Sequence, residues 1–311
     1  MRKILLTSIF MLLMAPAAAL CADNKTEAEP NIFAALEQGS DGKVEQVIDP
    51  LTVKLRDVRI IHLTGLVYPD YDPYKPGPFS VTALNVLRDF LKNQIVKVSR
   101  TKGSKTGRIT RMGHEIAHVT RAGDDIWVQG MMIGLGLARV RTEKDNPEMS
   151  AEMYRLEQAA RSEKAGIWEL SAYAISSPEG AAARVGSFQI VEGRVKSVGM
   201  RNNTTYLNFG NNWKKDFTVV LSAQSRRDFL KLGINPMDWN GQAMRVRGWV
   251  GFFNGPVIDI DHPEAIELLD KEPQEKEESP EKESQTKAST KILGQEKPVF
   301  TKGDALPDAN R

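Results

Sequence analysis

Two stretches decide the fold of this chain, WVQGMMIGLGLARV at residues 127–140 and LEQAARSEKAGIW at residues 156–168. Apolar side chains at helical spacing in the first stretch predict a helical segment, of which residues 131–137 are the beginning. The second stretch belongs to a helix predicted over residues 150–165, because a serine opens the segment as an N-cap and Gly166 follows it. The two stretches therefore predict a pair of helices that follow the strand-rich part of the chain.

Upstream of these helices, the pattern is typical of strands and turns. Apolar residues recur at strand spacing over residues 44–63, with a turn at Asp49-Pro50, and four prolines predict a loop over residues 68–78. Residues 81–91 carry apolar side chains at positions 81, 84, 87, 90 and 91, which predicts one amphipathic helix. Short strands are expected at 95–98, 115–120 and 126–128.

A second unit is predicted over residues 186–269. About five short strands, one helical turn near Phe229 and many turn residues indicate a second small β-barrel. Residues 270–311 mix Lys, Glu, Ser, Pro and Gln with few apolar side chains, so we expect a disordered charged tail. The sequence does not identify a protein partner for this tail, although a tail of this kind can tether a scaffold protein.

The start of the chain is typical of a secretory signal peptide. Arg2 and Lys3 precede an apolar run, and small residues follow Pro16, so residues 1–22 are predicted to be removed and residues 23–42 to form a lead-in segment. This pattern predicts an exported protein, periplasmic or secreted. The alternative is a lipid anchor on Cys21, but Leu20 stands where a lipoprotein cleavage site needs a small residue. No later stretch is long and apolar enough to predict a transmembrane helix.

Charge distribution indicates two candidate binding surfaces. The net charge of the 311 residues is only +2, but residues 92–111 hold seven basic side chains and no acidic one. Either this is a solvated basic hairpin or it faces phosphate groups, and the predicted ligand-binding residues there are Lys102, Lys105, Arg108 and Arg111. In the second unit, Lys214 and Lys215 follow Trp213, and basic residues interleaved with aromatic ones can contact nucleic acid. Alternating aromatic residues in strands more often form a buried core.

Four stretches together resemble the thermonuclease, or staphylococcal-nuclease-like, domain family. They are VIDPLTVKL at 47–55, IHLTGLVYP at 61–69 and the two stretches that open this section. The resemblance covers residues 43–172 and implies a mixed α+β fold, a five-stranded OB-type barrel with helices. Residues 173–185 then read as a linker, and residues 186–269 are similar to a small OB-type module that can follow such domains in exported bacterial proteins.

The resemblance also implies a catalytic site, and this chain departs from it at every charged position. Family enzymes use calcium, aspartates that hold it, a carboxylate that positions water and two arginines that stabilise the phosphoryl charge. The metal aspartates fall on Leu51 and Val67, the arginines on His62 and His114, and the glutamate on Asp70. The inherited mechanism is therefore expected to be lost, and no cofactor is expected unless calcium chemistry survives.

Two functions follow from these observations as expectations. The first is a catalytically impaired binding module whose partner is nucleic acid or another anionic polymer. The alternative is an active or weak phosphodiesterase, rebuilt as a zinc or acid–base site around His62, His114 and Asp70. Another histidine, His118, is expected on the opposite strand face or at the surface, away from this cluster.

Overall fold

The computed structural model describes residues 31–212 and 214–269. The predicted signal peptide and the whole of the predicted tail lie outside this range. Contacts place the described residues in one compact unit, and the predicted domain boundaries stay predictions. Within this part of the chain, no helix has the length and apolar character that crossing a membrane requires.

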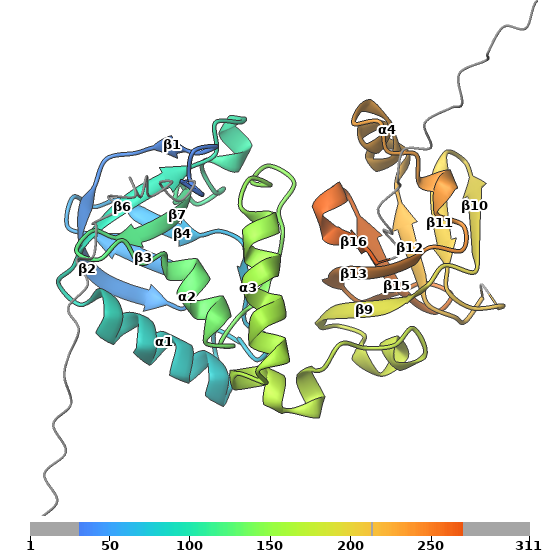
Figure 1. The fold of residues 1–311 in the computed structure, drawn as a ribbon, viewed down its shortest axis with the longest axis horizontal. Coiled ribbons are helices and arrows are strands. Elements are labelled where there is room, and N and C mark those ends of the chain that lie inside the picture. Colours follow the sequence, from blue (N-terminus) through green and yellow to red (C-terminus); the bar gives the residue numbers. More distant parts are fainter. Residues whose placement is uncertain (1–30, 213, 270–311) are drawn as a thin grey trace, which may run out of the picture. The chain divides into compact units, whose positions relative to one another are not determined.

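A closed five-stranded barrel forms the first half of the described chain (Figure 1). Hydrogen bonds run around it in the order β2, β3, β4, β7 and β6, and the pairing of β6 with β2 closes the ring. Short β1 extends the sheet beside β6, and β5 pairs with β8 outside the ring. The bounds are β1 Glu37–Gln38, β2 Gly42–Asp49, β3 Thr52–Leu55, β4 Ile60–Leu63, β5 Leu66–Val67, β6 Ile95–Arg100, β7 Glu115–Arg121 and β8 Arg139–Val140. The predicted mixed α+β barrel fold is confirmed.

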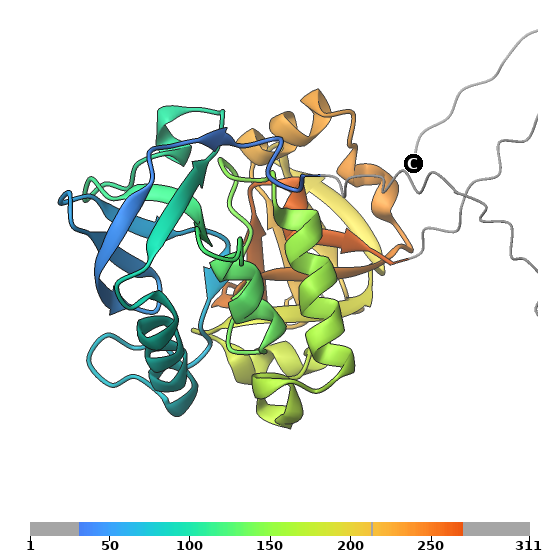
Figure 2. The same cartoon turned by 60° about the vertical axis from the view of Figure 1, so that its left-hand side comes forward.

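Three helices accompany this barrel, and α1 lies across one end of it (Figure 2). They are α1 Pro78–Leu91, α2 Val128–Gly134 and α3 Ser150–Ser162, and α2 packs against α3. The buried face of α1 is Ser80, Ala83, Leu87 and Leu91, so the predicted stripe is right at positions 87 and 91 and is displaced by one residue in the first turns. Ser150 is the first residue of α3 and makes no capping hydrogen bond, contrary to the prediction. Short 3₁₀ helices cover 105–107, 166–169, 171–173 and 179–184.

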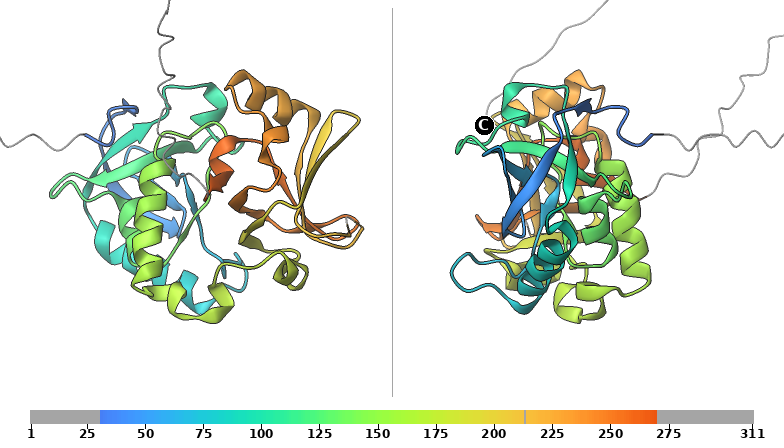
Figure 3. Two further views of the ribbon diagram at one scale, coloured as in Figure 1. Left: turned by 45° about the vertical axis from the view of Figure 1, so that its right-hand side comes forward. Right: turned by 90° about the vertical axis from the view of Figure 1, so that its left-hand side faces the viewer.

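The remaining described residues form two sheets around one core, and Figure 3 shows their hairpins. One sheet has the order β10, β11, β12, β15 and β14, and the other has the order β16, β13 and β9. The bounds are β9 Phe188–Arg194, β10 Ser197–Arg201, β11 Thr204–Asn208, β12 Thr218–Leu221, α4 Ala223–Lys231, β13 Ala243–Trp249, β14 Gly251–Phe252, β15 Pro256–Ile260 and β16 Ile266–Leu268, with 3₁₀ helices at 236–239 and 263–265. A second β-rich unit is thus present, and its OB type stays a prediction.

The ends of α2 and α3 meet at two glycines that cannot carry a side chain. Gly136 has φ of +64°, and a Cβ there would lie 2.0 Å from the carbonyl oxygen of Ala165. Gly166 has φ of +54°, and its Cβ would lie 2.3 Å from the carbonyl oxygen of Gly136. Left-handed backbone and close contact therefore both require glycine at this junction.

Replacing Gly136 by alanine is expected to lower the free energy of unfolding by about 2 kcal/mol or more, since the left-handed conformation alone costs an L-residue roughly 1–2 kcal/mol. Urea unfolding followed by circular dichroism measures the change. Gly134→Ala is the matched control, because its Cβ meets no atom within 4 Å. An equal loss of stability in both variants would contradict this account of the junction.

Candidate functional site

The barrel places His62 at the centre of a group of charged side chains. It lies on β4, where it pairs with Thr52 of β3 and Ile116 of β7, and its side chain is half-buried. Burial lowers the pKa of His62, and the charges of Arg141 and His114 lower it as well, whereas Glu143 and Asp49 oppose the change. His62 is therefore mostly neutral at pH 7. Its imidazole can take part in hydrogen bonds but carries little positive charge.

The structure places His114 close enough to His62 for its charge to lower the pKa of His62. His114 precedes β7 in a tight turn, where its backbone N–H donates to Thr110 Oγ1 at 3.1 Å and its carbonyl accepts from the Thr110 N–H at 2.8 Å. Its side chain is half-buried. His62 lies in β4 and His114 directly precedes β7, the strand that pairs with β4.

Asp70, the third predicted site residue, has a different set of partners. Its carboxylate accepts hydrogen bonds from the Phe79 N–H at 2.8 Å and from the Ser80 N–H at 3.0 Å, and the Ser80 hydroxyl donates to it as well. These are the first residues of α1, so Asp70 satisfies N–H groups that the helix leaves free. The carboxylates that act on His62 are instead Asp49 and Glu143.

The positions of the family's metal aspartates carry no oxygen ligand. Leu51 packs against the barrel core, and Val67 is buried in β5. Calcium takes six to eight oxygen ligands, so the side chains at these two positions do not fit it. Among residues 31–212 and 214–269, no group of three or more His, Cys, Asp or Glu side chains is arranged to hold a metal ion.

Sequence reasoning missed Arg141 and Glu143, which follow β8. β8 pairs with β5, and the Arg141 N–H donates to the Gly65 carbonyl at 3.0 Å, so this segment runs beside the chain that leaves His62. Glu143 accepts from the Thr64 hydroxyl at 3.1 Å. The Arg141 side chain is exposed, with no hydrogen bond or ion pair to the described residues. Their position directly after the motif at 127–140 was the signal that points to them.

Tyr68 is a second residue that the sequence did not single out. Its ring is buried, and its hydroxyl has no hydrogen-bond partner among the described residues. Burial raises the pKa of Tyr68, and the charge of Asp49 raises it further, so the hydroxyl keeps its proton. Tyr68 and His62 are therefore both influenced by the charge of Asp49.

The basic stretch at 92–111 is partly neutralised by acidic residues far away in the sequence. Glu37 pairs with Arg108 at 2.7 Å and with Arg100 at 2.9 Å, and Asp125 pairs with Lys97 at 2.6 Å. Of the predicted ligand-binding residues, Lys102 donates to the Ala34 carbonyl at 3.0 Å. Lys105 and Arg111 are exposed and have no side-chain partner among the described residues.

The two lysines predicted in the second unit lie in a turn that Asn212 organises. The N–H of Lys214 donates to Asn212 Oδ1 at 3.1 Å, and the N–H of Lys215 donates to the Asn212 carbonyl at 3.0 Å. Lys215 and Lys196 line a cavity of about 640 Å³. Both predicted lysines are exposed.

The comparison with known families agrees with this architecture. A profile described as "Staphylococcal nuclease homologue" matches residues 61–170, which include β4, β7 and both helices of the motif region. Residues 61–170 form a thermonuclease-like domain. This domain indicates a nuclease-related or nucleic-acid-binding function. A search of curated proteins finds no match to the chain.

His118 is buried in the domain core, and its ring lies 5.5 Å from that of Trp127. Of the two expected positions, the surface is therefore wrong, and the opposite strand face stays a prediction. Burial lowers the pKa of His118 to about 3. In the unfolded chain, the His118 side chain takes up a proton near pH 6.5. Below that pH, the unfolded chain therefore binds more protons than the folded protein. The contribution of His118 to the free energy of unfolding is therefore complete above pH 6.5 and is lost as the pH falls towards 3.

Replacing His118 by leucine is expected to remove this pH dependence. The wild-type free energy of unfolding should fall by about 2 kcal/mol more than that of the variant between pH 7 and pH 5, from about 1.4 kcal/mol per pKa unit. Urea unfolding at both pH values gives the difference. Parallel losses in the two proteins would show that His118 accepts a proton in the folded state.

Proposed function

We propose that this is an exported thermonuclease-like protein that binds nucleic acid or another anionic polymer and does not cleave it by the family's calcium mechanism. The observation that carries the proposal is a preserved barrel whose charged positions have been replaced. Leu51 and Val67 stand at the metal positions, and His62 and His114 stand at the arginine positions. The export part of the proposal rests on residues 1–22 of the sequence.

Electrostatics support the loss of this mechanism. An arginine pairs with phosphate through two parallel hydrogen bonds and stays charged, whereas a neutral imidazole offers one donor. His62 has a lowered pKa, so protonation near pH 7 does not restore the missing charge. Asp70, at the position of the family's glutamate, is held by the first turn of α1.

Exposed cations support binding. Lys105 and Arg111 remain without acidic partners among the described residues, and Arg141 adds a third exposed charge beside His62. Lys214 and Lys215 provide a further basic segment in the second unit. Cations of this kind give an affinity for polyanions that depends on salt rather than on sequence.

Titration of labelled single-stranded DNA, duplex DNA, RNA and heparin at several salt concentrations tests the proposal. We expect binding that weakens linearly in a double-logarithmic plot, with a slope reduced by about two in the variant Lys105→Ala/Arg111→Ala. Lys54→Ala is the matched control, since Lys54 pairs with Glu45 at 3.1 Å. Absence of binding to every polyanion at low salt would overturn the proposal.

A second candidate function is phosphodiester hydrolysis by a rebuilt site. The proximity of His62 and His114, with Asp49 and Glu143 acting on the first of them, favours it. Paired imidazoles with carboxylate neighbours are suited to acid–base catalysis.

A further inference from the structure

A cavity of about 240 Å³ lies where the segment after β8 meets the second unit. Arg141, Thr142, Glu143 and Lys144 form one wall, and the end of β13 with residues 261–265 forms the other. The first wall begins at the arginine whose charge acts on His62. The cavity is therefore lined both by the segment that follows β8 and by residues of the second unit.

One wall of this cavity carries a positive charge without a partner. Lys144 pairs with Asp228 at 2.8 Å, Asp261 pairs with His262 at 2.6 Å, and Glu143 is bound to Thr64. Arg141 has no such partner among the described residues and is exposed. An exposed guanidinium with all five N–H donors available is suited to a phosphate group.

The opposite wall carries an exposed aromatic ring. Trp249 lies at the end of β13 and is 56% exposed, although its neighbour Val250 is buried. It meets Phe188 in an edge-to-face arrangement with ring centres 6.2 Å apart, and more than half of its surface stays exposed. Exposed indole faces stack on the bases of nucleic acids.

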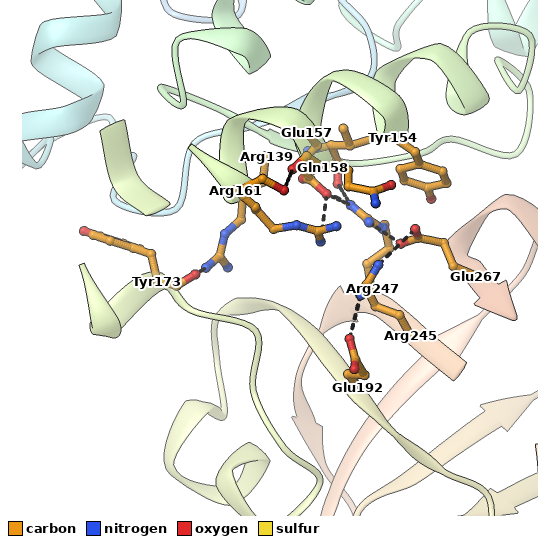
Figure 4. A network of polar contacts seen from close by, with 12 residues as sticks. Arg139, Tyr154, Glu157, Gln158, Arg161, Tyr173, Glu192, Arg245, Arg247 and Glu267 are labelled. Atoms are coloured by element: carbon orange, nitrogen blue, oxygen red, sulfur yellow. Dashed lines mark hydrogen bonds and ion pairs between the residues drawn. The ribbon is translucent and has the colours of Figure 1, made fainter. Parts of the chain in front are cut away.

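The cavity walls are fixed by polar contacts that join the two units. His262 bonds to the Thr142 hydroxyl at 2.8 Å, and the buried Arg247 pairs with Glu157 of α3 at 3.0 Å. Figure 4 shows Arg247 between Glu157 and Glu267. Arg247 also lines the cavity, and its Nε is buried without a hydrogen-bond partner among the described residues. The Arg141 and Trp249 walls are thus held relative to each other before any ligand binds.

We propose that this cavity binds a single nucleotide unit, with Trp249 stacking on the base and Arg141 pairing with the phosphate. Ligand pockets for drug-sized molecules occupy about 300–1,000 Å³, so this smaller cavity has no room for more than one nucleotide, part of which would lie outside it. The inference rests on the proposed affinity for nucleic acid and assigns part of it to the second unit. No bond is made or broken in this binding step.

Calorimetric titration of the full chain with adenosine 5′-monophosphate, adenosine and inorganic phosphate tests the site. We expect the monophosphate to bind at least about tenfold more tightly than either fragment, because it uses both walls. Trp249→Leu should weaken its binding by about tenfold or more, as loss of base stacking does. Arg141→Gln should reduce it to the level of adenosine.

Two matched variants serve as controls. Phe252→Leu removes another aromatic side chain that is 70% exposed in the second unit, and Arg56→Gln removes another exposed arginine; neither lines the cavity. Both should bind the monophosphate like the wild type. The inference is overturned if the monophosphate does not bind, if it binds no better than phosphate, or if the controls lose as much affinity as the cavity variants. Salt-dependent binding of polymers in any of these cases leaves the proposed function standing.

Discussion

Replacing Glu157 by alanine is expected to lower the free energy of unfolding by about 3–5 kcal/mol. Glu157 is 0% exposed, and its carboxylate accepts from the Val140 N–H at 2.8 Å and from Arg247 at 3.0 Å, with Arg161 at 3.7 Å (Figure 4). Its loss leaves Arg247, only 2% exposed, with less compensation for a buried charge. Urea unfolding of the variant and the wild type measures the difference.

Arg247 cannot escape this cost by losing its proton. Burial lowers the pKa of Arg247, but Glu157, Tyr154 and Glu267 outweigh burial and raise it above its usual range. The guanidinium also lies over the Tyr154 ring, 4.1 Å from its centre. In the variant, Glu267 remains as its acidic partner at 2.5 Å, which places the expected loss within this range rather than above it.

A matched control and a repair separate charge from packing. Glu152→Ala removes a glutamate from the same helix, but its partner Arg155 is exposed, so a loss below about 1 kcal/mol is expected. Glu157→Leu combined with Arg247→Met replaces the pair by apolar side chains and should recover most of the stability. If Glu157→Ala costs no more than the control, the pair does not hold the two units together.

The sequence predicts the barrel because its apolar spacing and turn residues act locally. Residues 127–140 and 156–168 lie where the two helices and their glycine junction form. The local sequence pattern does not predict the burial of a side chain whose partner is far away in the sequence. Glu157 looks like a solvated helix residue in the sequence, and only Arg247, ninety positions further along, explains its burial.

Distant partners also surround the residues predicted for the candidate site. His62 and His114 were predicted from motif positions, and the parallel pairing of β4 with β7 brings them together. Arg108 was predicted to bind ligand, but Glu37, seventy-one positions earlier, pairs with it. Asp70 looked like a catalytic carboxylate, and the helix that follows it uses both of its oxygens.

Calcium-dependent cleavage of DNA by the wild-type protein is expected to be at least about 10⁴-fold slower than cleavage by a nuclease that keeps both arginines. Loss of one preorganised donor at a developing charge costs about 10²–10³ in rate, and His62 and His114 represent two such losses. Release of acid-soluble nucleotides, measured with calcium, zinc or chelator, gives the rate. His62→Ala and His114→Ala should leave any slow cleavage unchanged, and Lys54→Ala provides the matched control.

The rebuilt-site alternative gives the opposite result in the same assay. If the imidazoles catalyse hydrolysis, each alanine variant loses at least about 10²-fold in rate, the smaller contribution expected of a general acid or base. Because His62 has a lowered pKa, the neutral form would act as the base, and the rate would fall as the pH drops below its pKa. Metal-dependent cleavage that both histidine variants abolish, with Lys54→Ala unaffected, would therefore replace the binding proposal by a catalytic one.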